Sequence, residues 1–536
     1  MTRNGGDRAS TRAYLVVTAF LSGLSVMVLE MAAVRAMAPY FGASDLIWTN
    51  VIGVILAALA VGYFIGGRMA DRRPVPGLLY GVVLCGGLLA LLVPLLLPGL
   101  SRWLIPADLG LESAAGHVYR ASLVATLLLF APPVLLLGGV SPITIKLLAG
   151  KDDVGNAAGR VFAAGTLGSL VGTFLTTLHL IPWLGTRPTI LVAGGTLTIT
   201  ALCGFVLFSI SKKGTAVGGT GAAALIILFL SGSSAVKAAP DLIEEVESAY
   251  QYVRVRDVIE YGESVRMLQI NEAEEAYQSV IVSGSHLTGG RYYDYYAVLP
   301  LLLGAPERAR LDCLVIGLAA GTIPRQLRHF YPGGLKVVGV EIDQKVIDLG
   351  RKYFEMPADE DWLETRVMDG RVYLKAAAAK PSFDLIIIDA FAQEYYIPFH
   401  LTTKEAFTEA FSALRDGGVL AMNVTAYRTD EALLSAIEQT VASVFGRAHR
   451  VEVEGYPNCM IFAMKGRHPP FGRLASPPTD GPAEWDELSR IARNVAATSA
   501  TILPRSNGLI LTDDRAPVER LTDELVERES KAVLGD

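Results

Sequence analysis

Acidic and small residues recur at the ends of apolar segments in the second half of this 536-residue chain. A carboxylate in such a place can accept both hydroxyl protons of a ribose, and glycines let the backbone approach a ligand closely. The pattern therefore predicts a nucleoside-binding site. The residues that we assign to it from their positions are Gly317, Gly321, Glu341, Asp369, Gly370 and Asp389.

The elements that must position these residues alternate between strands and helices. Apolar strands are predicted at 311–316, 336–340 and 383–389, with a helix at 323–330 after the first and another helix after the second. A further strand follows the turn at 414–420. Strands that alternate with helices favour a parallel α/β sheet, whose ligands bind at the carboxyl ends of the strands. The acidic positions fall at those ends.

Shorter strands precede this pattern and a loop-like stretch follows it. Residues 252–256 and 265–270 alternate in polarity around a turn, whereas 466–485 are rich in Pro and Gly. We predict four parts. They are a transmembrane helical domain at 1–236, a small β-strand subdomain at 237–305, a Rossmann-like nucleoside-binding domain at 306–465, and a C-terminal loop and tail at 466–536.

The first half of the chain consists of long apolar runs with few charges. A helix that spans a bilayer needs about 20 mostly apolar residues. Seven runs qualify, the last one weakly: 13–37, 47–67, 77–98, 120–148, 158–182, 188–210 and 217–235. Gly165, Gly168 and Gly172 suit close helix packing. The expected fold is an α-helical polytopic membrane domain of about seven spans, followed by an α/β Rossmann-like, methyltransferase-type domain with a small N-terminal β-subdomain.

Basic residues predict the orientation of these spans. Arg8 and Arg12 precede the first span, and Lys212 and Lys213 follow the sixth. Because cytoplasmic loops are rich in Lys and Arg, the N-terminus is expected in the cytoplasm. Seven crossings would place the second half of the chain outside the cell, and six would place it inside. The seventh run has a central apolar stretch at 222–230 only, so the sequence leaves this parity open.

Charge and cysteine patterns argue against two kinds of partner. The formal net charge is −6, which gives no support to nucleic-acid binding. The four cysteines lack the close spacing of a metal site, so no metal is predicted: Cys85, Cys203, Cys313 and Cys459.

Several segments in order over about 245–465 resemble the spermidine synthase (aminopropyltransferase) family in its membrane-fused bacterial form. Residues 247–251, Glu-Ser-Ala-Tyr-Gln, are similar to the family's Glu-Ser-Pro-Tyr-Gln. Residues 291–301 are similar to its Tyr-bearing helix, 340–343 to its ribose-binding segment, and 401–407 to its Leu-Phe-Thr-x-x-Phe-Tyr segment. The resemblance implies that Gln251 and Gln278 contact the nucleoside and that Tyr292 contacts the substrate. It also implies that Asp389 helps to deprotonate an attacking amine.

The chemistry that this resemblance implies is transfer of an aminopropyl group from decarboxylated S-adenosylmethionine to a polyamine. With putrescine the products would be spermidine and methylthioadenosine. Such a site must position an amine and remove its proton, which suits carboxylates and Tyr. Because S-adenosylmethionine derivatives are kept in the cytoplasm, the catalytic half is expected there, on the inner membrane of a bacterium. The expected partners are a polyamine or other amine and the lipid bilayer, and a homodimer stays open.

Two departures from the family leave the reaction open. Ala320 stands where the family has an Asp in its glycine-rich turn, and Ala392 replaces the second Asp of Asp-Ser-Ser-Asp. Both losses weaken the attraction for a polycation. Carboxylates that could replace them are Glu394, Asp294, Asp513 and Asp514. Two other hypotheses are methyl transfer from S-adenosylmethionine to a membrane-delivered amine or lipid, and a nucleoside- or polyamine-binding sensor-transporter without catalysis.

Overall fold

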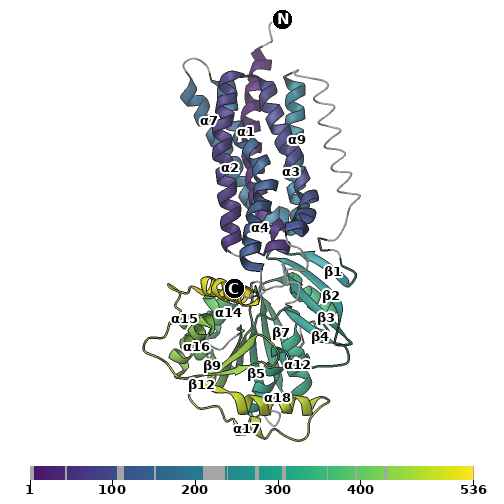
Figure 1. Cartoon of the computed structure of the whole chain (residues 1–536), viewed down its shortest axis with the longest axis vertical. Helices are drawn as coiled ribbons and strands as arrows, with labels where there is room; N and C mark the ends of the chain where they lie inside the picture. Colours follow the sequence, from purple (N-terminus) through teal and green to yellow (C-terminus); the bar gives the residue numbers. More distant parts are fainter. Residues whose placement is uncertain are drawn as a thin grey trace. The chain divides into compact units, whose positions relative to one another are not determined.

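The chain divides into two compact units (Figure 1). Met1–Ala238 and Glu247–Tyr252 group together as a helical unit, and Ala239–Val246 with Val253–Asp536 form a sheet-containing unit. The computed structural model describes residues 5–42, 45–104, 114–149, 153–208, 236–237, 239–271, 277–304, 310–358, 360–392, 395–427 and 431–534.

Long apolar helices build the first unit, as the sequence predicts. Among the described residues, six helices are long and apolar enough to cross a membrane. They correspond to the first six predicted spans, and the seventh, at 217–235, lies outside the described residues. The elements are α1 (Gly5–Phe41), α2 (Asp45–Arg72), α3 (Pro76–Leu104), α4 (Ala114–Leu129), α5 (Ala131–Gly138), α6 (Val140–Leu148), α7 (Val154–Leu175), a π-helical turn (Thr176–Leu180), α8 (Ile181–Leu184) and α9 (Thr186–Leu207).

Two of the predicted spans are interrupted. The fourth, predicted at 120–148, is divided into α4, α5 and α6, and two prolines follow Ala131 in the first turn of α5. The fifth widens into the π-helical turn before Pro182. Proline lacks the N–H of a regular helical hydrogen bond and its ring clashes with the preceding turn, which explains both irregularities.

Glycines allow α1 and α7 to approach closely. A Cβ added to Gly168 would lie 2.0 Å from the carbonyl oxygen of Phe20, and one on Gly172 would lie 2.5 Å from that of Leu24. Any side chain at these two positions would therefore push the helices apart. The close packing predicted for this glycine-rich helix is confirmed at Gly168 and Gly172.

A four-stranded antiparallel sheet begins the second part of the chain. Its strands run in the order β1 (Leu242–Glu247), β2 (Tyr252–Glu260), β3 (Glu263–Ile270) and β4 (Ser279–Val282). Tyr261 and Gly262 join β2 to β3, and both have positive φ, as the right-handed twist of a two-residue hairpin requires. The small β-subdomain thus has the two strands that the sequence predicts, each longer than expected.

The large sheet has eight strands in the order β12-β10-β11-β9-β8-β5-β6-β7. Strands β7, β6, β5, β8 and β9 are parallel, whereas β11, β10 and β12 are antiparallel, so the sheet is mixed rather than wholly parallel. The bounds are β5 (Leu311–Ile316), β6 (Leu335–Glu341), β7 (Leu363–Val367), β8 (Phe383–Ile388), β9 (Leu414–Thr425), β10 (Ala448–Glu452), β11 (Asn458–Met464) and β12 (Ala500–Ile502).

Helices cover both faces of this sheet (Figure 1). Alternate residues of β5 point to opposite layers: Cys313 and Val315 pack in one hydrophobic core, and Leu314 and Ile316 in the other. The helices are α11 (Tyr292–Val298), α12 (Thr322–Phe330), α13 (Gln344–Tyr353), α14 (Gly370–Ala377), α15 (Lys404–Ala413), α16 (Ala432–Phe445), α17 (Gly472–Ala475), α18 (Trp485–Thr498) and α19 (Val518–Leu534). The order of strands reverses between β5 and β8, which is where open α/β sheets bind ligands.

The C-terminal region differs from the expected loop and tail. Residues 466–534 contain α17, α18, β12 and α19, and β12 pairs with β10 at the edge of the large sheet. Trp485, Leu488, Ile491 and Val495 recur with helical spacing and lie buried in the core beside α12. The Pro- and Gly-rich stretch at 466–485 predicts a loop, and the amphipathic helix begins only where that stretch ends.

Candidate active site

Asp389 lies directly after β8, at the carboxyl end of the strand. Its amide donates a hydrogen bond of 2.8 Å to the carbonyl of Ile316 in β5. The hydroxyl of Tyr296 lies 3.4 Å from Oδ1, and Tyr292 and Asn423 also donate to the carboxylate. Burial raises the pKa of Asp389 to about 7, although these hydrogen bonds oppose the rise. A carboxyl group with this pKa can accept a proton near neutral pH.

The tyrosines reach Asp389 because they stand one helical turn apart. Tyr292 and Tyr296 occupy positions i and i+4 of α11, and both are buried. Burial raises the pKa of each phenol well above its usual value, so both hydroxyls stay protonated and act as donors. The two rings also pack in the hydrophobic core, since every residue of α11 is buried. Tyr292 and Asp389, predicted from distant motifs, therefore lie together.

Tyr296 and Asn423 are site residues that the sequence analysis missed. Tyr296 was available from its spacing to Tyr292, and Asn423 is a polar side chain inside the otherwise apolar, buried segment of β9. Its amide oxygen accepts a hydrogen bond of 3.1 Å from Asn458, which fixes the orientation of the Asn423 side chain. A buried polar residue in an apolar strand is the signal that could have identified it.

Glu341 ends β6 and faces the turn that follows β5. Its carboxylate accepts hydrogen bonds from the amides of Ala319 at 2.9 Å and Asp343 at 3.1 Å. Burial raises its pKa to about 7, and the two backbone hydrogen bonds oppose this rise. The side chain keeps some solvent exposure. The remaining lone pairs of this carboxylate can accept hydroxyl protons from a ribose.

The turn at 317–321 is compact because its glycines occupy positions that exclude a side chain. Gly317 has φ +84°, and a Cβ there would lie 2.2 Å from the carbonyl oxygen of Asp389. Gly321, with φ +90°, precedes the first residue of α12. The backbone amides of the turn donate to protein acceptors, among them Ala320 to Ser279 Oγ at 2.9 Å. The turn therefore offers a ligand close backbone approach rather than free amide donors.

Asp369 and Gly370 begin α14 beside the end of β7. Oδ1 of Asp369 accepts from the amides of Arg371 and Val372 at 2.9 and 3.0 Å, as a helix N-cap does. Oδ2 lies 3.2 Å from Nε2 of His400, a neighbour that the sequence did not indicate. A Cβ on Gly370 would lie 2.3 Å from a methyl group of Ile316, so this end of the site also requires glycine.

The two glutamines are placed differently. Gln278 immediately precedes β4, and its amide donates 2.8 Å to the carbonyl of Leu268. The amide of Val280, on the same strand, donates to Thr322 Oγ1 at 3.0 Å, which ties β4 to the start of α12. Gln251 belongs to the segment that groups with the helical unit, so its assignment to the nucleoside stays a prediction.

The carboxylates expected to replace the missing Asp residues are mostly engaged elsewhere. Asp294 is fully buried and accepts from Thr288, Gly290 and Gln326, so it organises the loop before α11. Asp513 accepts from Thr403 and Arg371. Asp514 is exposed, and Glu394 lies outside the described residues.

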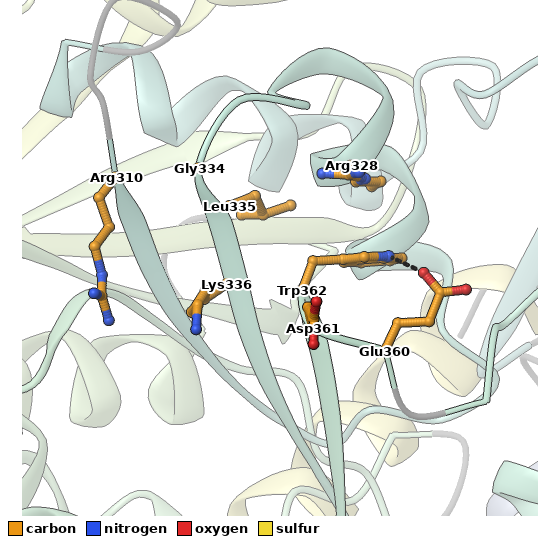
Figure 2. A pocket seen from close by; sticks show the side chains of 8 residues that line it. All are labelled: Arg310, Arg328, Gly334, Leu335, Lys336, Glu360, Asp361 and Trp362. Atoms are coloured by element: carbon orange, nitrogen blue, oxygen red, sulfur yellow. Dashed lines mark hydrogen bonds between the residues drawn. The ribbon is translucent and has the colours of Figure 1, made fainter.

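A separate cavity of about 690 Å³ lies at the amino ends of the parallel strands, opposite to the ends that carry Asp389 and Glu341 (Figure 2). It is lined by Arg310, Lys336 and Trp362, which stand at the amino ends of β5, β6 and β7. Figure 2 shows the indole of Trp362 donating to Glu360, at 2.7 Å, with Arg328 nearby. No predicted site residue lines this cavity.

Comparison with known proteins connects this geometry to one family. Residues 300–470 match the family model described as the spermine/spermidine synthase domain. This match contains Gly317, Gly321, Glu341, Asp369, Gly370 and Asp389 and begins after Tyr292. The resemblance to the spermidine synthase family is therefore confirmed.

Curated relatives carry related names. A probable polyamine aminopropyl transferase of Bifidobacterium longum is 33% identical over 304 residues, covering 52% of this chain and 62% of the relative. A polyamine aminopropyltransferase of Vibrio vulnificus is 36% identical over 166 residues, covering 30% of this chain and 52% of the relative. The chain thus spans between about half and two thirds of the length of these relatives. A probable spermidine synthase structure from Corynebacterium glutamicum is 19% identical and covers 52% of this chain and 97% of its own, with a TM-score of 0.40.

Proposed function

We propose that this chain is a membrane-anchored aminopropyltransferase of the spermidine synthase type. Its sheet unit would transfer an aminopropyl group from decarboxylated S-adenosylmethionine to a polyamine such as putrescine, giving spermidine and methylthioadenosine. The observation that carries this proposal is the buried carboxylate of Asp389, with a pKa of about 7, between the hydroxyls of Tyr292 and Tyr296. The family match and the names of the relatives support the reaction class.

The chemical step requires a base, whereas the sulfonium of the donor already activates the carbon that is attacked. The nitrogen lone pair of the amine attacks the aminopropyl carbon, and the bond from that carbon to the sulfonium breaks, leaving its electron pair on sulfur. The attacking nitrogen must lose a proton, and Asp389 is placed to accept it. A base whose pKa is near the working pH combines a substantial ionised fraction with enough basicity to remove the proton.

The donor nucleoside would lie across the carboxyl ends of β5, β6 and β7. Glu341 would accept the ribose hydroxyls, and the turn from Gly317 to Gly321 would let the ligand approach the backbone. Asp369, Gly370 and Gln278 would border the base. These assignments are made from positions in the fold and from the family resemblance.

Methyl transfer from S-adenosylmethionine is a second candidate, and one observation favours it. Ala320 is fully buried and carries no carboxylate, and Asp294, a candidate replacement, accepts hydrogen bonds from its own loop. Without that carboxylate the site loses an electrostatic attraction for a donor that ends in a lone ammonium group, and its preference for this donor should be weaker. The same strand-end carboxylates would serve either donor.

The helical unit would anchor the enzyme in the inner membrane of a bacterium. Six long apolar helices in the described part of the chain support the anchoring. An even number of crossings with a cytoplasmic N-terminus would place the sheet unit in the cytoplasm, where the donor is made. The basic residues before the first apolar run support the same orientation.

Identifying the products decides between the two reactions. The full chain, purified in detergent, is incubated with putrescine and either decarboxylated or intact S-adenosylmethionine. The proposal predicts methylthioadenosine from the decarboxylated donor. Formation of S-adenosylhomocysteine from the intact donor, with no methylthioadenosine, would establish the second candidate instead. Nucleoside binding without either product would support the sensor hypothesis.

A further inference from the structure

Two histidines and a glutamate meet on the side of the sheet unit covered by α12 and α18. His286 lies in the loop before α11, His329 in the last turn of α12, and Glu484 directly before α18. The two imidazole rings stack with centroids 3.6 Å apart and planes within 6°. Nδ1 of His286 is 3.4 Å, and Nε2 of His329 is 4.0 Å, from Oε2 of Glu484. One ligand atom from each residue lies within 4.8 Å of the other two.

The surrounding structure holds Glu484 in place. Its backbone has φ +67°, an uncommon conformation for a residue with a side chain, which persists only where neighbouring contacts impose it. Ser285 Oγ donates to Oε1, and the amide of His286 donates 2.9 Å to Oε2. The carboxylate is therefore fixed against the loop that carries His286.

We propose that His286, His329 and Glu484 form a binding site for a divalent transition-metal ion of the Zn²⁺ class. Two imidazole nitrogens and one carboxylate oxygen suit first-row transition metals, whereas Ca²⁺ and Mg²⁺ prefer sets of oxygen ligands. With bonds of about 2.1 Å in a tetrahedral site, ligand atoms stand about 3.4 Å apart. The separations of 3.4 and 4.0 Å are close to this value, and the two stacked rings must rotate so that a nitrogen of each points toward the ion.

The site has a further oxygen and an open side. The carbonyl oxygen of Ala483 lies 3.0 Å from Nε2 of His329, close enough to become a fourth ligand when the metal displaces the proton between them. A cavity of about 210 Å³ borders both imidazoles. The three side chains keep 41%, 18% and 24% of their surfaces exposed for His286, His329 and Glu484, so an ion can reach them from solvent.

Two arginines line the same cavity, and each has partners of its own. Arg325 pairs with Glu355 at 2.9 Å and donates to the carbonyl of Ser285, so its charge is offset in part. Arg328 stacks its guanidinium 5.3 Å from the ring centroid of Trp362 and donates to the carbonyl of Pro332. Glu484 supplies the negative charge at the three-residue cluster itself.

The metal would join three segments that are far apart in the chain. It would fix α18 to the end of α12 and to the loop that leads into α11, the helix of Tyr292 and Tyr296. Binding to the folded state alone stabilises that state by mass action. Zn²⁺ is therefore expected to raise the unfolding temperature of the sheet unit.

The test titrates ZnCl₂ into the purified full chain after a chelator has removed bound metal. Calorimetry should show saturable binding of one Zn²⁺, and saturation should raise the unfolding temperature. His329→Ala, His286→Ala and the shape-preserving Glu484→Gln should each weaken binding at least tenfold and abolish this thermal shift. His468→Ala, which removes an exposed histidine outside the cluster, should bind as the wild type does.

The unfolding temperature of each metal-free variant shows whether it folds, and Glu484→Gln carries the test if a histidine variant does not. The proposal is overturned if the wild type shows no saturable binding of one ion. It is equally overturned if folded cluster variants bind Zn²⁺ as tightly as His468→Ala does.

Discussion

Asp389 combines two opposing influences on one carboxyl group. Burial removes it from water and raises its pKa to about 7, while donors from Tyr292, Tyr296 and Asn423 favour the ionised form. Its position at a strand end could be predicted from an apolar run that stops at an acidic residue. Its partners could not, because they depend on how α11 and β9 pack around it. The same holds for Asp294, whose four donors come from a loop and from α12.

Tyr296→Phe is expected to shift the pH dependence of activity upward. Loss of its hydroxyl removes a donor that favours the ionised carboxylate, so the pKa of Asp389 rises further above about 7. Since the base must be ionised, activity rises with pH, and the midpoint of this rise in kcat/KM should move up by about one pH unit. Tyr331→Phe is the control, because that hydroxyl donates to the carbonyl of Ala297 instead. Equal midpoints in both variants would refute the role of Tyr296.

At the scale of elements, the sequence predicts the turn after β5 but not the structure of the C-terminal region. The strands and the glycine positions follow from local pattern, because burial and backbone conformation act over a few residues. The antiparallel edge of the sheet and the engagement of Asp513 depend on long-range contacts, which no local pattern contains. The cluster of His286, His329 and Glu484 could likewise not be predicted from the sequence, because its members come from three separate segments.

Gly317→Ala is expected to destabilise the sheet unit more than a glycine replacement in open space. Both Gly317 and Gly446 have positive φ, which opposes a side chain by about 1–2 kcal/mol. Only at Gly317 would the Cβ also meet backbone, at 2.2 Å, whereas nothing lies within 4 Å at Gly446. Thermal unfolding should show a total loss of about 3 kcal/mol or more for Gly317→Ala. Equal losses in Gly317→Ala and Gly446→Ala would contradict the close packing of the turn against Asp389.

Asp513→Asn is expected to loosen the attachment of the C-terminal region. Burial opposes the charge on Asp513, but hydrogen bonds from Thr403 and Arg371 outweigh it and lower the pKa below its usual value. Because this side chain is 44% exposed, the loss in stability should be about 1 kcal/mol. Limited proteolysis should cut the tail faster in Asp513→Asn, and Asp514→Asn should behave as the wild type. Unchanged cleavage would show that this contact does not hold the tail.

At the scale of the whole molecule, the two units were predictable as separate kinds of structure. Apolar runs and a charged α/β pattern occupy different halves of the chain, and hydropathy distinguishes them. The number of crossings was not predictable, since the segment 217–235 is apolar over a short stretch only. It lies outside the described residues, so the sidedness of the sheet unit stays a proposal.

A reporter at the C-terminus of the full chain is expected to lie in the cytoplasm. Green fluorescent protein fused there should fluoresce, and alkaline phosphatase fused at the same residue should be inactive. The prediction rests on the basic N-terminus and on the six long apolar helices among the described residues, which make an even number of crossings if the segment 217–235 does not cross. Active phosphatase and a dark fluorescent fusion would place the sheet unit outside and separate it from its donor.

Release of methylthioadenosine by the wild type and by Asp389→Asn tests the central proposal most directly. The full chain is given decarboxylated S-adenosylmethionine and putrescine at pH 7.5, and nucleoside affinity is measured in parallel. We predict product from the wild type and a loss of about 10²–10⁴-fold in kcat for Asp389→Asn, with affinity for the nucleoside unchanged. Full turnover in Asp389→Asn would contradict the assignment of Asp389 as the base.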